Sequence, residues 1–403
     1  MLPYVTERLV YLAPGLPGIP EELMLARDRG DVLFMTGAGV SMAEPSNLPL
    51  FRGLVLEIAS RLDARLGAAM EAWVGAFEAR NQGDPIPPAS MFADELDPRQ
   101  HAELARFVRG DFDIVLGMLE RRMPSQPGRA SSMRAAAAEI LDAAHQSNRL
   151  HAALNVLARR NDQLCVATTN FDRLHERAAK RPKPPAYGLE GLPRPSRDPA
   201  FHGVFHIHGV LEPGRSRQLV LTDQDFGDLY LRRRLTADFI YDAVRIFRLA
   251  IIGYSLNDAP FRYLLNAVAG DTRHFPDLKD RYAFVPRPAG NLVIQADWTA
   301  RSIVPICYDE SDKHAELGRL LQAWAESVPQ PTSDAWARKR LRKMIWRTYA
   351  EADEADQSVF GYIFRRASGV EQIALAKFLG ECGAAPEWLT AANGLIREER
   401  ANL

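Results

Sequence analysis

The chain has 403 residues, of which 47% are hydrophobic and 25% charged, and its formal net charge is −1. A chain of this length can bury a large core and form two or three structural units. The near-neutral charge excludes a global electrostatic attraction to nucleic acid or to acidic membranes, although local patches remain open.

The three cysteines, Cys165, Cys307 and Cys382, stand far apart, and the sequence contains no CxxC pair. This spacing predicts neither a disulfide framework nor a cysteine-rich zinc site, and it is typical of a reducing compartment. The first residues lack the pattern of a secretory signal, and no apolar run approaches the ~20 residues that span a bilayer. We therefore expect a cytoplasmic protein without a membrane contact.

Residues 1–20 look irregular, and a short helix is expected over 21–29. An apolar run, 32–35, then ends at Thr36 and opens into the glycine turn 37–39. A buried strand that ends on glycines favours phosphate binding, because backbone without a Cβ can turn sharply and bring N–H groups close to a pyrophosphate. The ordinary dinucleotide fingerprint needs a third glycine, and Met42 stands there instead.

The segment 54–161 is mostly helical in periodicity. It is too long for a single connection between a strand and a helix, and we interpret it as a helical insertion or subdomain. The expected helices lie over 54–66, 70–79, 101–109, 112–121 and 131–160.

Strand patterns return after this segment, separated by helical patterns and by a proline-rich loop over 180–199. Strands alternating with helices predict an α/β fold with a doubly wound parallel sheet. The expected strands lie over 163–167, 203–207, 249–252, 282–285 and 303–308, with a hairpin-like return through 218–221.

The C-terminal part shows no strand pattern, and three helices are expected over 335–353, 359–379 and 386–399, the second with a potential break at Gly369. The predicted organisation is an α/β domain over 1–53 and 162–328, the helical insertion over 54–161, and a helical C-terminal unit over 329–403.

A basic stretch, 338–347, lies on the first C-terminal helix and turns Leu341, Met344 and Ile345 toward one side. A solvated basic face packed on its own unit is the favoured interpretation, and a docking surface for a partner or nucleic acid is the alternative.

Four predicted strands end in polar or glycine-rich runs: TGAGVS, TTNFD, HIHG and GYSLND. Ligands of open parallel sheets bind at the carboxyl ends of the strands, so these runs are expected to meet. Each residue also has a structural interpretation. Asn and Asp at strand ends form turns and caps, and Ser41 can be a helix N-cap. Alternation places His206 and His208 on one face, but no carboxylate at suitable spacing supports a metal site there.

The four runs, in this order, resemble those of the sirtuin (SIR2) family. GAGVS followed by LPLFR resembles the NAD-binding signature GAGxS and GIPDFR, and TTNFD resembles TQNID, with Thr169 in place of Gln and Phe171 in place of Ile. His208 and Gly209 resemble the HG that carries the family's catalytic histidine, and Gly253-Tyr254-Ser255 resembles GTS or GSS. The resemblance covers roughly residues 20–310 and implies a Rossmann-like SIR2 fold with NAD as substrate.

The resemblance also implies roles for single residues. Asn170 would lie beside the reacting ribose and position the nucleophile, and His208 would act as general base on a ribose hydroxyl or on water. Asp172 would accept hydrogen bonds from the nicotinamide carboxamide. Asp258 is equally well explained as a cap of a helix that starts near Pro260. The other residues implied in NAD binding are Gly37, Ala38 and Gly39 with Ser41 at the phosphates, Arg52 over the phosphate or ribose, Thr169, and Gly253, Ser255 and Asp258 at the adenosine half.

The sequence departs from sirtuin deacetylases at two points. These enzymes hold a structural zinc with two CxxC pairs, which this chain lacks, and Leu50 stands where the PDFR motif has Asp. We therefore predict no zinc. The helical insertion and C-terminal unit resemble instead the SIR2-like effectors of prokaryotic anti-phage defence, which hydrolyse NAD.

The preferred hypothesis is thus an NAD glycohydrolase that gives ADP-ribose and nicotinamide. One alternative is a zinc-free NAD-dependent protein deacylase or ADP-ribosyltransferase, and another is a non-catalytic sensor or scaffold that binds NAD or ADP-ribose. A hydrolase of this kind needs gating, through a homo-oligomer or a partner protein such as a HerA-type ATPase or an Argonaute. Direct nucleic-acid binding is not predicted.

Overall fold

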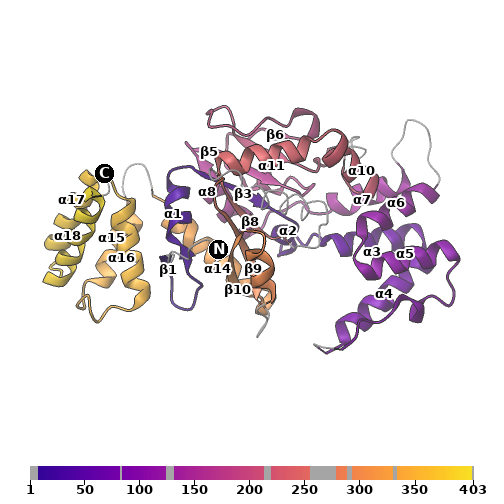
Figure 1. Cartoon of the computed structure of the whole chain (residues 1–403), viewed down its shortest axis with the longest axis horizontal. Helices are drawn as coiled ribbons and strands as arrows, with labels where there is room; N and C mark the ends of the chain where they lie inside the picture. The colour runs from indigo at the N-terminus through magenta and orange to yellow at the C-terminus, as the bar shows by residue number, and fades with distance from the viewer. Residues whose placement is uncertain are drawn as a thin grey trace.

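The computed structural model describes residues 8–81, 84–123, 131–212, 219–254, 278–287, 293–329 and 334–401. A parallel sheet lies at the centre of the molecule, between a helical region at one end and the C-terminal helices at the other (Figure 1). None of the helices in the described part of the chain combines the length and the apolar character needed to cross a bilayer.

Seven parallel strands of the described residues form the central sheet, in the order β10-β9-β8-β3-β5-β7-β6, and the short β4 pairs antiparallel with β5. This confirms the predicted doubly wound parallel sheet. The strands are β3 (Val32–Thr36), β4 (Arg159–Arg160), β5 (Gln163–Thr168), β6 (Ala186–Tyr187), β7 (Gly203–His206), β8 (Arg248–Ile252), β9 (Arg281–Arg287) and β10 (Val304–Asp309).

Both faces of the sheet are covered, which explains why its strands are continuous apolar runs. In β3, Val32 and Phe34 pack into one layer of the core, and Leu33 and Met35 pack into the other. The first layer contains α1 (Glu21–Asp28), α8 (Arg149–Leu157) and α14 (Ser311–Ser327), and the second contains α11 (Leu235–Ile246) and α13 (Val293–Thr299).

Most of the helices between β3 and β5 build a core of their own, in which Trp73 contacts Phe107. The expected single helix over 131–160 is wrong. The first helix ends at Asp142, and Asn148 caps a new helix by accepting the N–H groups of Leu150 and His151. The helices are α2 (Gly39–Met42), α3 (Phe51–Leu62), α4 (Ala64–Ala79), η1 (Ala89–Phe92), α5 (Pro98–Arg109), α6 (Phe112–Arg122) and α7 (Ser132–Asp142), followed by α8.

The C-terminal part contains four helices in the described residues, because the expected helix over 359–379 is broken just before Gly369, where the sequence has a potential break. The first of the two helices ends at Arg366, and Ser368 caps the second by accepting the Glu371 N–H. The helices are α15 (Ala335–Met344), α16 (Glu354–Arg366), α17 (Gly369–Glu381) and α18 (Pro386–Ala401).

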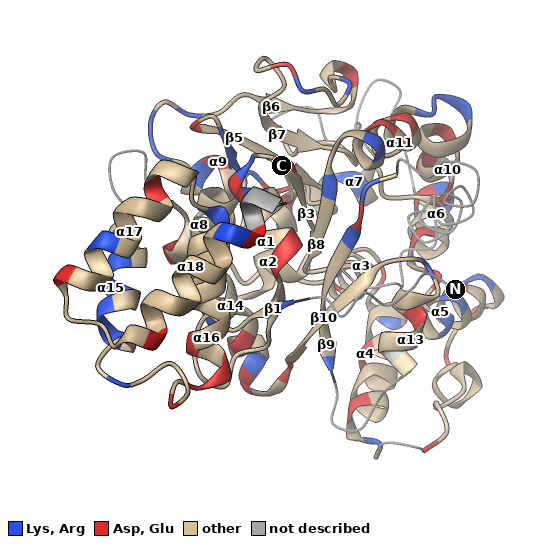
Figure 2. Ribbon diagram, turned by 60° about the vertical axis from the view of Figure 1, so that its left-hand side comes forward, with Lys and Arg blue, Asp and Glu red and all other residues tan. Residues whose placement is uncertain are grey.

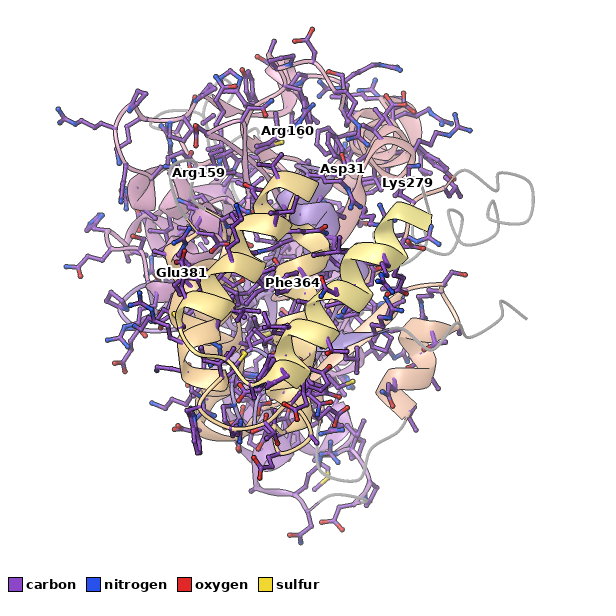
Figure 3. All side chains as sticks on the ribbon, turned by 90° about the vertical axis from the view of Figure 1, so that its left-hand side faces the viewer. Asp31, Arg159, Arg160, Lys279, Phe364 and Glu381 are labelled. Atoms are coloured by element: carbon purple, nitrogen blue, oxygen red, sulfur yellow. The ribbon has the colours of Figure 1, made fainter. Side chains whose placement is uncertain are left out.

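The C-terminal helices pack on α1. The Tyr362 hydroxyl donates to Asp28 Oδ2 over 2.6 Å, and Arg365 pairs with Glu21 at 2.7 Å. Seen from that end, the C-terminal helices stand in front of the molecule, with the buried Phe364 labelled on them (Figure 3). The same contact region holds β1 (Leu9–Val10) and β2 (Ile19–Pro20), a short antiparallel pair in the segment expected to be irregular.

Lys and Arg residues line α15 (Figure 2). As the sequence indicates, Leu341, Met344 and Ile345 are buried on one side of this segment. Arg340 and Arg347 pair with Asp356 of α16, so part of the basic face is tied to its own helical unit. Docking of a partner on the remainder stays a prediction.

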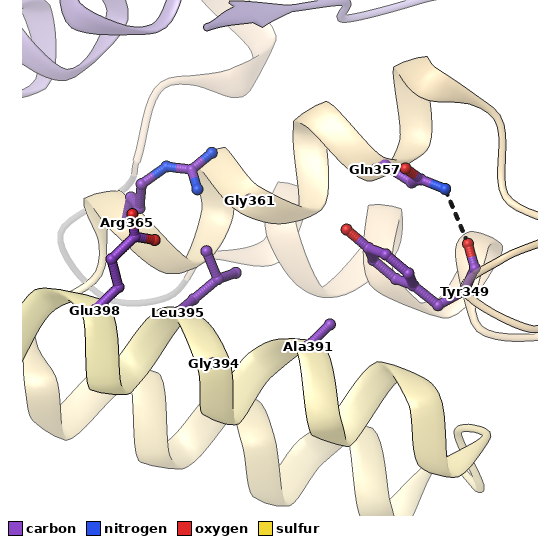
Figure 4. Close-up of a pocket in the computed structure, with 8 residues that line it drawn as sticks. All are labelled: Tyr349, Gln357, Gly361, Arg365, Ala391, Gly394, Leu395 and Glu398. Atoms are coloured by element: carbon purple, nitrogen blue, oxygen red, sulfur yellow. Dashed lines mark hydrogen bonds between the residues drawn. The ribbon is translucent and has the colours of Figure 1, made fainter.

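Helices α16 and α18 border a hollow of about 320 Å³ (Figure 4). It belongs to the C-terminal helices and therefore differs in place from the strand ends where the sequence predicts a ligand. Its lining residues are Tyr349, Gln357, Gly361, Arg365, Ala391, Gly394, Leu395 and Glu398.

Two short elements follow β5 and β6, and two more precede α11. For the expected hairpin-like return through 218–221, the described residues show a hydrogen bond from the Val220 N–H to the His208 carbonyl. The elements are α9 (Leu174–Ala178), η2 (Leu189–Gly191), α10 (Asp223–Gly227) and the π-helical turn η4 (Asp228–Arg232).

Candidate active site

The carboxyl ends of β3, β5 and β8 lie at one level of the sheet. Thr36 at the end of β3 is in register with Thr168 of β5 on one side and with Ile252 of β8 on the other. The chain runs from β3 to β5 and β7 in one direction and later from β8 to β9 and β10 in the other, so the order of strands reverses here. Ligands of open α/β sheets bind at such a switch point.

The glycine turn packs directly on the end of β8. The N–H groups of Gly37 and Gly39 donate to the carbonyls of Ile252 and Gly253, each over 2.9 Å. A Cβ at Gly37 would lie 2.6 Å from the Gly253 carbonyl oxygen. Gly253 itself has φ of +67°, a left-handed conformation that favours glycine. These glycines thus allow two backbone turns to touch, and the Ala38 N–H keeps no hydrogen-bond partner among the described residues.

Ser41 joins the two runs that follow β3 and β5. It lies inside α2, whose N-cap is Ala38, so the interpretation of Ser41 as an N-cap is wrong. The buried Ser41 hydroxyl donates to Asp172 Oδ2 over 2.9 Å and accepts from Asn170 Nδ2 over 3.1 Å. His151 Nε2 of α8 lies 3.3 Å from the same oxygen.

Asn170 is fixed at several points although it lies outside regular structure. Its main-chain N–H donates to Thr168 Oγ1 over 3.0 Å, and its Nδ2 donates to the Gly37 carbonyl over 3.2 Å as well as to Ser41. The amide oxygen Oδ1 has no hydrogen-bond partner among the described residues. The side chain therefore offers an acceptor beside the glycine turn.

Asp172 serves as a turn former, as its residue type suggests. Its Oδ1 accepts the Leu174 N–H over 3.0 Å while Oδ2 accepts the Ser41 hydroxyl. Burial raises the pKa of this carboxyl and outweighs both hydrogen bonds, which lower it. Each carboxylate oxygen can accept more than one hydrogen bond, so these contacts leave capacity for a ligand.

His208 follows β7 at the same level as Asn170 follows β5, because Thr168 and His206 are in register. It is 3% exposed. Its Nε2 lies 2.8 Å from the hydroxyl of Tyr230, in the π-helical turn η4, and its ring makes an edge contact with Phe226. The side chain of Asn170 donates to Gly37 and Ser41, whereas the His208 ring lies against Tyr230 and Phe226. The two residues therefore stand side by side at the strand ends but contact different neighbours.

The expectation that His206 and His208 share a face is wrong. The strand ends at His206, where the Gly209 N–H donates to the His206 carbonyl and the chain turns. His206 consequently faces Asn170 and Glu176, whereas His208 faces Tyr230. Within the described residues, no group of three or more His, Cys, Asp or Glu side chains is arranged to hold a metal ion.

The zinc of sirtuin deacetylases finds no fitting ligands among the cysteines. Cys165 is buried in β5, Cys307 lies in β10, and Cys382 is exposed after α17. Three thiols on separate elements do not form a tetrahedral thiolate site.

Four predicted residues lie apart from this cluster or outside the described part of the chain. The Thr169 N–H donates to the Thr36 carbonyl over 3.1 Å, at the margin of the cluster. Arg52 of α3 pairs with Glu78 over 3.2 Å, toward α4. Ser255 and Asp258 lie outside the described residues.

Three buried histidines stand behind the cluster, and sequence reasoning missed two of them, His151 and His175. Burial lowers the pKa of His151 to about 3 and that of His175 well below its usual value, so both rings are neutral. His175 Nε2 contacts Thr36 Oγ1 and its Nδ1 contacts Asn155 Oδ1. The sequence signal that could have indicated His151 is Asn148, a residue type that favours helix N-caps. As the cap of α8, it places His151 at the third position of that helix. Nothing in the sequence indicated Tyr230.

Residues 164–306 match the SIR2-like domain, a range that contains Asn170, Asp172, His208 and Gly253 and begins after the glycine turn. The fold and the match together define the class, an α/β protein with a SIR2-like domain. Such a domain suggests NAD-related activity.

The chain is also similar to the uncharacterized protein y4cA of Sinorhizobium fredii (strain NBRC 101917 / NGR234). It is 30% identical over 365 residues, which cover 87% of this chain and 26% of that protein. The chain thus spans about a quarter of the length of this relative.

Proposed function

We propose that this chain hydrolyses NAD at the bond between nicotinamide and ribose, giving ADP-ribose and nicotinamide. One observation carries the proposal: Asn170, Asp172 and Ser41 form a hydrogen-bonded cluster on the glycine turn, at the switch point of a sheet whose strands β6 to β9 and most of β5 lie in the SIR2-like match. His208 ends the neighbouring strand.

The residue types suit this cleavage. Breaking the bond develops positive charge on the ribose, so fixed acceptors near the ribose stabilise the transition state more than the substrate. We assign this role to Asn170 Oδ1, which would also orient the attacking water. His208 would accept a proton from a ribose hydroxyl or from that water. The Tyr230 hydroxyl, 2.8 Å from His208 Nε2, would orient the ring.

The remaining residues would bind the substrate. Asp172 would accept hydrogen bonds from the nicotinamide carboxamide, and the Ala38 N–H is a donor for a phosphate oxygen. The structural roles of Gly37, Gly39 and Gly253 are compatible with this, because a Cβ at any of them would press against the facing turn. Arg52 would have to leave Glu78 to reach a phosphate.

Burial supports the gating part of the proposal. Asn170 is 8% exposed and His208 is 3% exposed, so both are largely covered, and a movement of neighbouring segments would open them to NAD. We propose that assembly, as a homo-oligomer or with a partner protein, drives this opening and that the chain acts as a gated effector of anti-phage defence.

The test is nicotinamide release from NAD by the purified chain, with and without an acylated peptide. The proposal expects release without the peptide, and Asn170→Ala and His208→Ala are each expected to lower the rate by about 100-fold or more, as for groups that act only in the transition state. His202→Ala, a change at a histidine whose ring is hydrogen-bonded to the Pro199 carbonyl, is the control.

Release that depends on the peptide would favour a zinc-free deacylase, and release that depends on a protein acceptor would favour an ADP-ribosyltransferase. NAD binding without turnover under every condition would favour a non-catalytic sensor. Full activity of both the Asn170 and the His208 variants would contradict the assigned roles.

A further inference from the structure

His206 forms a buried pair with Glu176 directly behind Asn170. The imidazole is 0% exposed and the Glu176 residue 6% exposed. His206 Nε2 lies 3.2 Å from Glu176 Oε1, and His206 Nδ1 lies 2.9 Å from the main-chain carbonyl oxygen of Asn170. The ring therefore bridges α9 and the run that follows β5.

The two contacts fix the number of protons that the pair holds. A carbonyl oxygen only accepts, so Nδ1 must carry a proton that it donates to Asn170. A carboxylate also only accepts, so Nε2 must carry a second proton, or Glu176 must carry it and donate to Nε2. In either case the pair holds one proton more than a neutral imidazole beside a carboxylate. Without it, a nitrogen lone pair would face the carboxylate in a buried site.

We propose that His206, protonated on both ring nitrogens and held by Glu176, is a positioning residue that clamps the main chain of Asn170 and so orients its side chain toward the substrate. The expected effect of the clamp on the reaction rate rests on the proposed hydrolysis of NAD, whereas the geometry of the clamp does not.

A clamp on the main chain matters because Asn170 belongs to no helix or strand. Thr168 Oγ1 holds its N–H, and Ser41 and the Gly37 carbonyl hold its Nδ2. The His206 bond is the one that holds its carbonyl oxygen. If it is lost, the peptide that links Asn170 to Phe171 can rotate, and a displacement of about 1 Å can lower a rate about 100-fold.

The charges near the pair favour its ionised form. Arg173 also contacts Glu176 Oε1 at 3.2 Å, which stabilises the carboxylate, whereas Glu176 Oε2, buried without a hydrogen-bond partner among the described residues, opposes its ionisation. Burial lowers the pKa of His206, but Glu176, the Asn170 carbonyl and Asp172 outweigh it, and the net pKa is raised. Burial raises the pKa of Glu176, but His206 outweighs it, and the net pKa is lowered.

Other titratable groups near the pair act weakly or in the opposite direction. His175, which precedes Glu176 in α9, is neutral because it is buried. If it were protonated, it would disfavour the charge of His206. Because the pKa of His206 is raised, the Nε2 proton that anchors the ring on Glu176 is lost as the pH rises through that pKa, while Nδ1 keeps its proton for the Asn170 carbonyl. The clamp then loosens because the ring has lost its anchor.

Two isosteric substitutions separate the two hydrogen bonds. Asn at position 206 places an amide N–H where Nδ1 stands and keeps the bond to Asn170, whereas Gln places it where Nε2 stands and keeps only the bond to residue 176. Both are made together with Glu176→Gln, so that no buried carboxylate is left unpaired. His202→Asn and His202→Gln are the matched controls at a neighbouring histidine.

We expect the His206→Gln/Glu176→Gln enzyme to lose kcat about 10- to 100-fold with a small change in KM, and the His206→Asn/Glu176→Gln enzyme to stay close to wild type. The wild-type rate should fall at high pH, and the His206→Asn/Glu176→Gln rate should not fall there. Equal rates of the two double variants, or an unchanged high-pH limb, would overturn the clamp. Thermal melts exclude unfolding as the cause.

A second readout needs no turnover. The ¹⁵N shifts of the His206 ring should show both nitrogens protonated at neutral pH, and the Asn170 carbonyl ¹³C shift should move in the His206→Gln/Glu176→Gln protein and stay in the His206→Asn/Glu176→Gln protein. If the wild type cleaves no NAD but these shifts appear, the clamp stands and the proposed function fails. A ring with one unprotonated nitrogen and Glu176 ionised would overturn the clamp whatever the activity.

Discussion

Ser41→Ala tests the cluster that joins the glycine turn to the run after β5. The hydroxyl is the one group that contacts Asn170, Asp172 and His151 together, through distances of 3.1, 2.9 and 3.3 Å. Alanine fits the same space in α2, because it only removes one oxygen atom. The change therefore deletes hydrogen bonds without adding a clash.

The expected loss follows from the partners that remain. Asn170 Nδ2 keeps the Gly37 carbonyl, and Asp172 keeps the Leu174 N–H. A buried hydrogen bond to a charged group contributes about 1.5–3 kcal/mol, and a neutral one about 1 kcal/mol. Ser41→Ala should lower the free energy of unfolding by about 2–4 kcal/mol. It should also raise the pKa of Asp172 further, because a donor to the carboxylate is lost.

Urea denaturation measures the loss, and Ser46→Ala is its matched control. Ser46 is equally buried and donates one neutral hydrogen bond, to the Gln146 carbonyl over 2.9 Å, so this variant should lose about 1 kcal/mol. Nicotinamide release should fall for Ser41→Ala and stay unchanged for Ser46→Ala. Equal losses of stability in the two variants, or full activity of Ser41→Ala, would refute the reasoning.

Two further predictions concern stability. Gly253→Ala should destabilise the protein more than Gly383→Ala, because both residues have positive φ but a Cβ at Gly253 would lie 2.6 Å from the Val40 nitrogen while one at Gly383 meets nothing within 4 Å; urea midpoints of the two variants check this, and equal midpoints would contradict it. His151, whose pKa burial lowers to about 3, binds its proton in the unfolded chain below about pH 6.5, so it should make stability fall by about 1.4 kcal/mol per pH unit as the pH drops from about 6.5 toward 3. His151→Gln should reduce that slope, and an unchanged slope would show that the ring is protonated in the folded protein.

The sheet could be predicted from the sequence because its signals are local. A strand buried on both faces is a continuous apolar run, as 32–35 and 249–252 show, and the polar runs after the strands mark its carboxyl edge. The meeting of the runs at Gly37 and Gly253 follows from parallel pairing alone.

The remainder of the site depends on distant contacts that no spacing reveals. Glu176 reaches His206 because α9 folds back beside β7, and Tyr230 reaches His208 through a π-helical turn that no periodicity indicates. The sequence predicts His206 and His208 on one face because nothing in it indicates that the strand, and with it the alternation of side chains, ends at His206. The helical pattern over 131–160 runs through Asn148 because alanine-rich periodicity continues on both sides of it. The cap at Asn148 is not evident from the sequence, since its partner at the third helical position is histidine and not Glu or Gln.

The most direct test of the central claim is a crystal structure of the Asn170→Ala variant with NAD bound. The account predicts that the nicotinamide ribose lies over the glycine turn, with a ribose hydroxyl within hydrogen-bonding distance of the His208 ring and the carboxamide at Asp172. NAD bound elsewhere, or a ribose at the glycine turn that His208 does not reach, would contradict it.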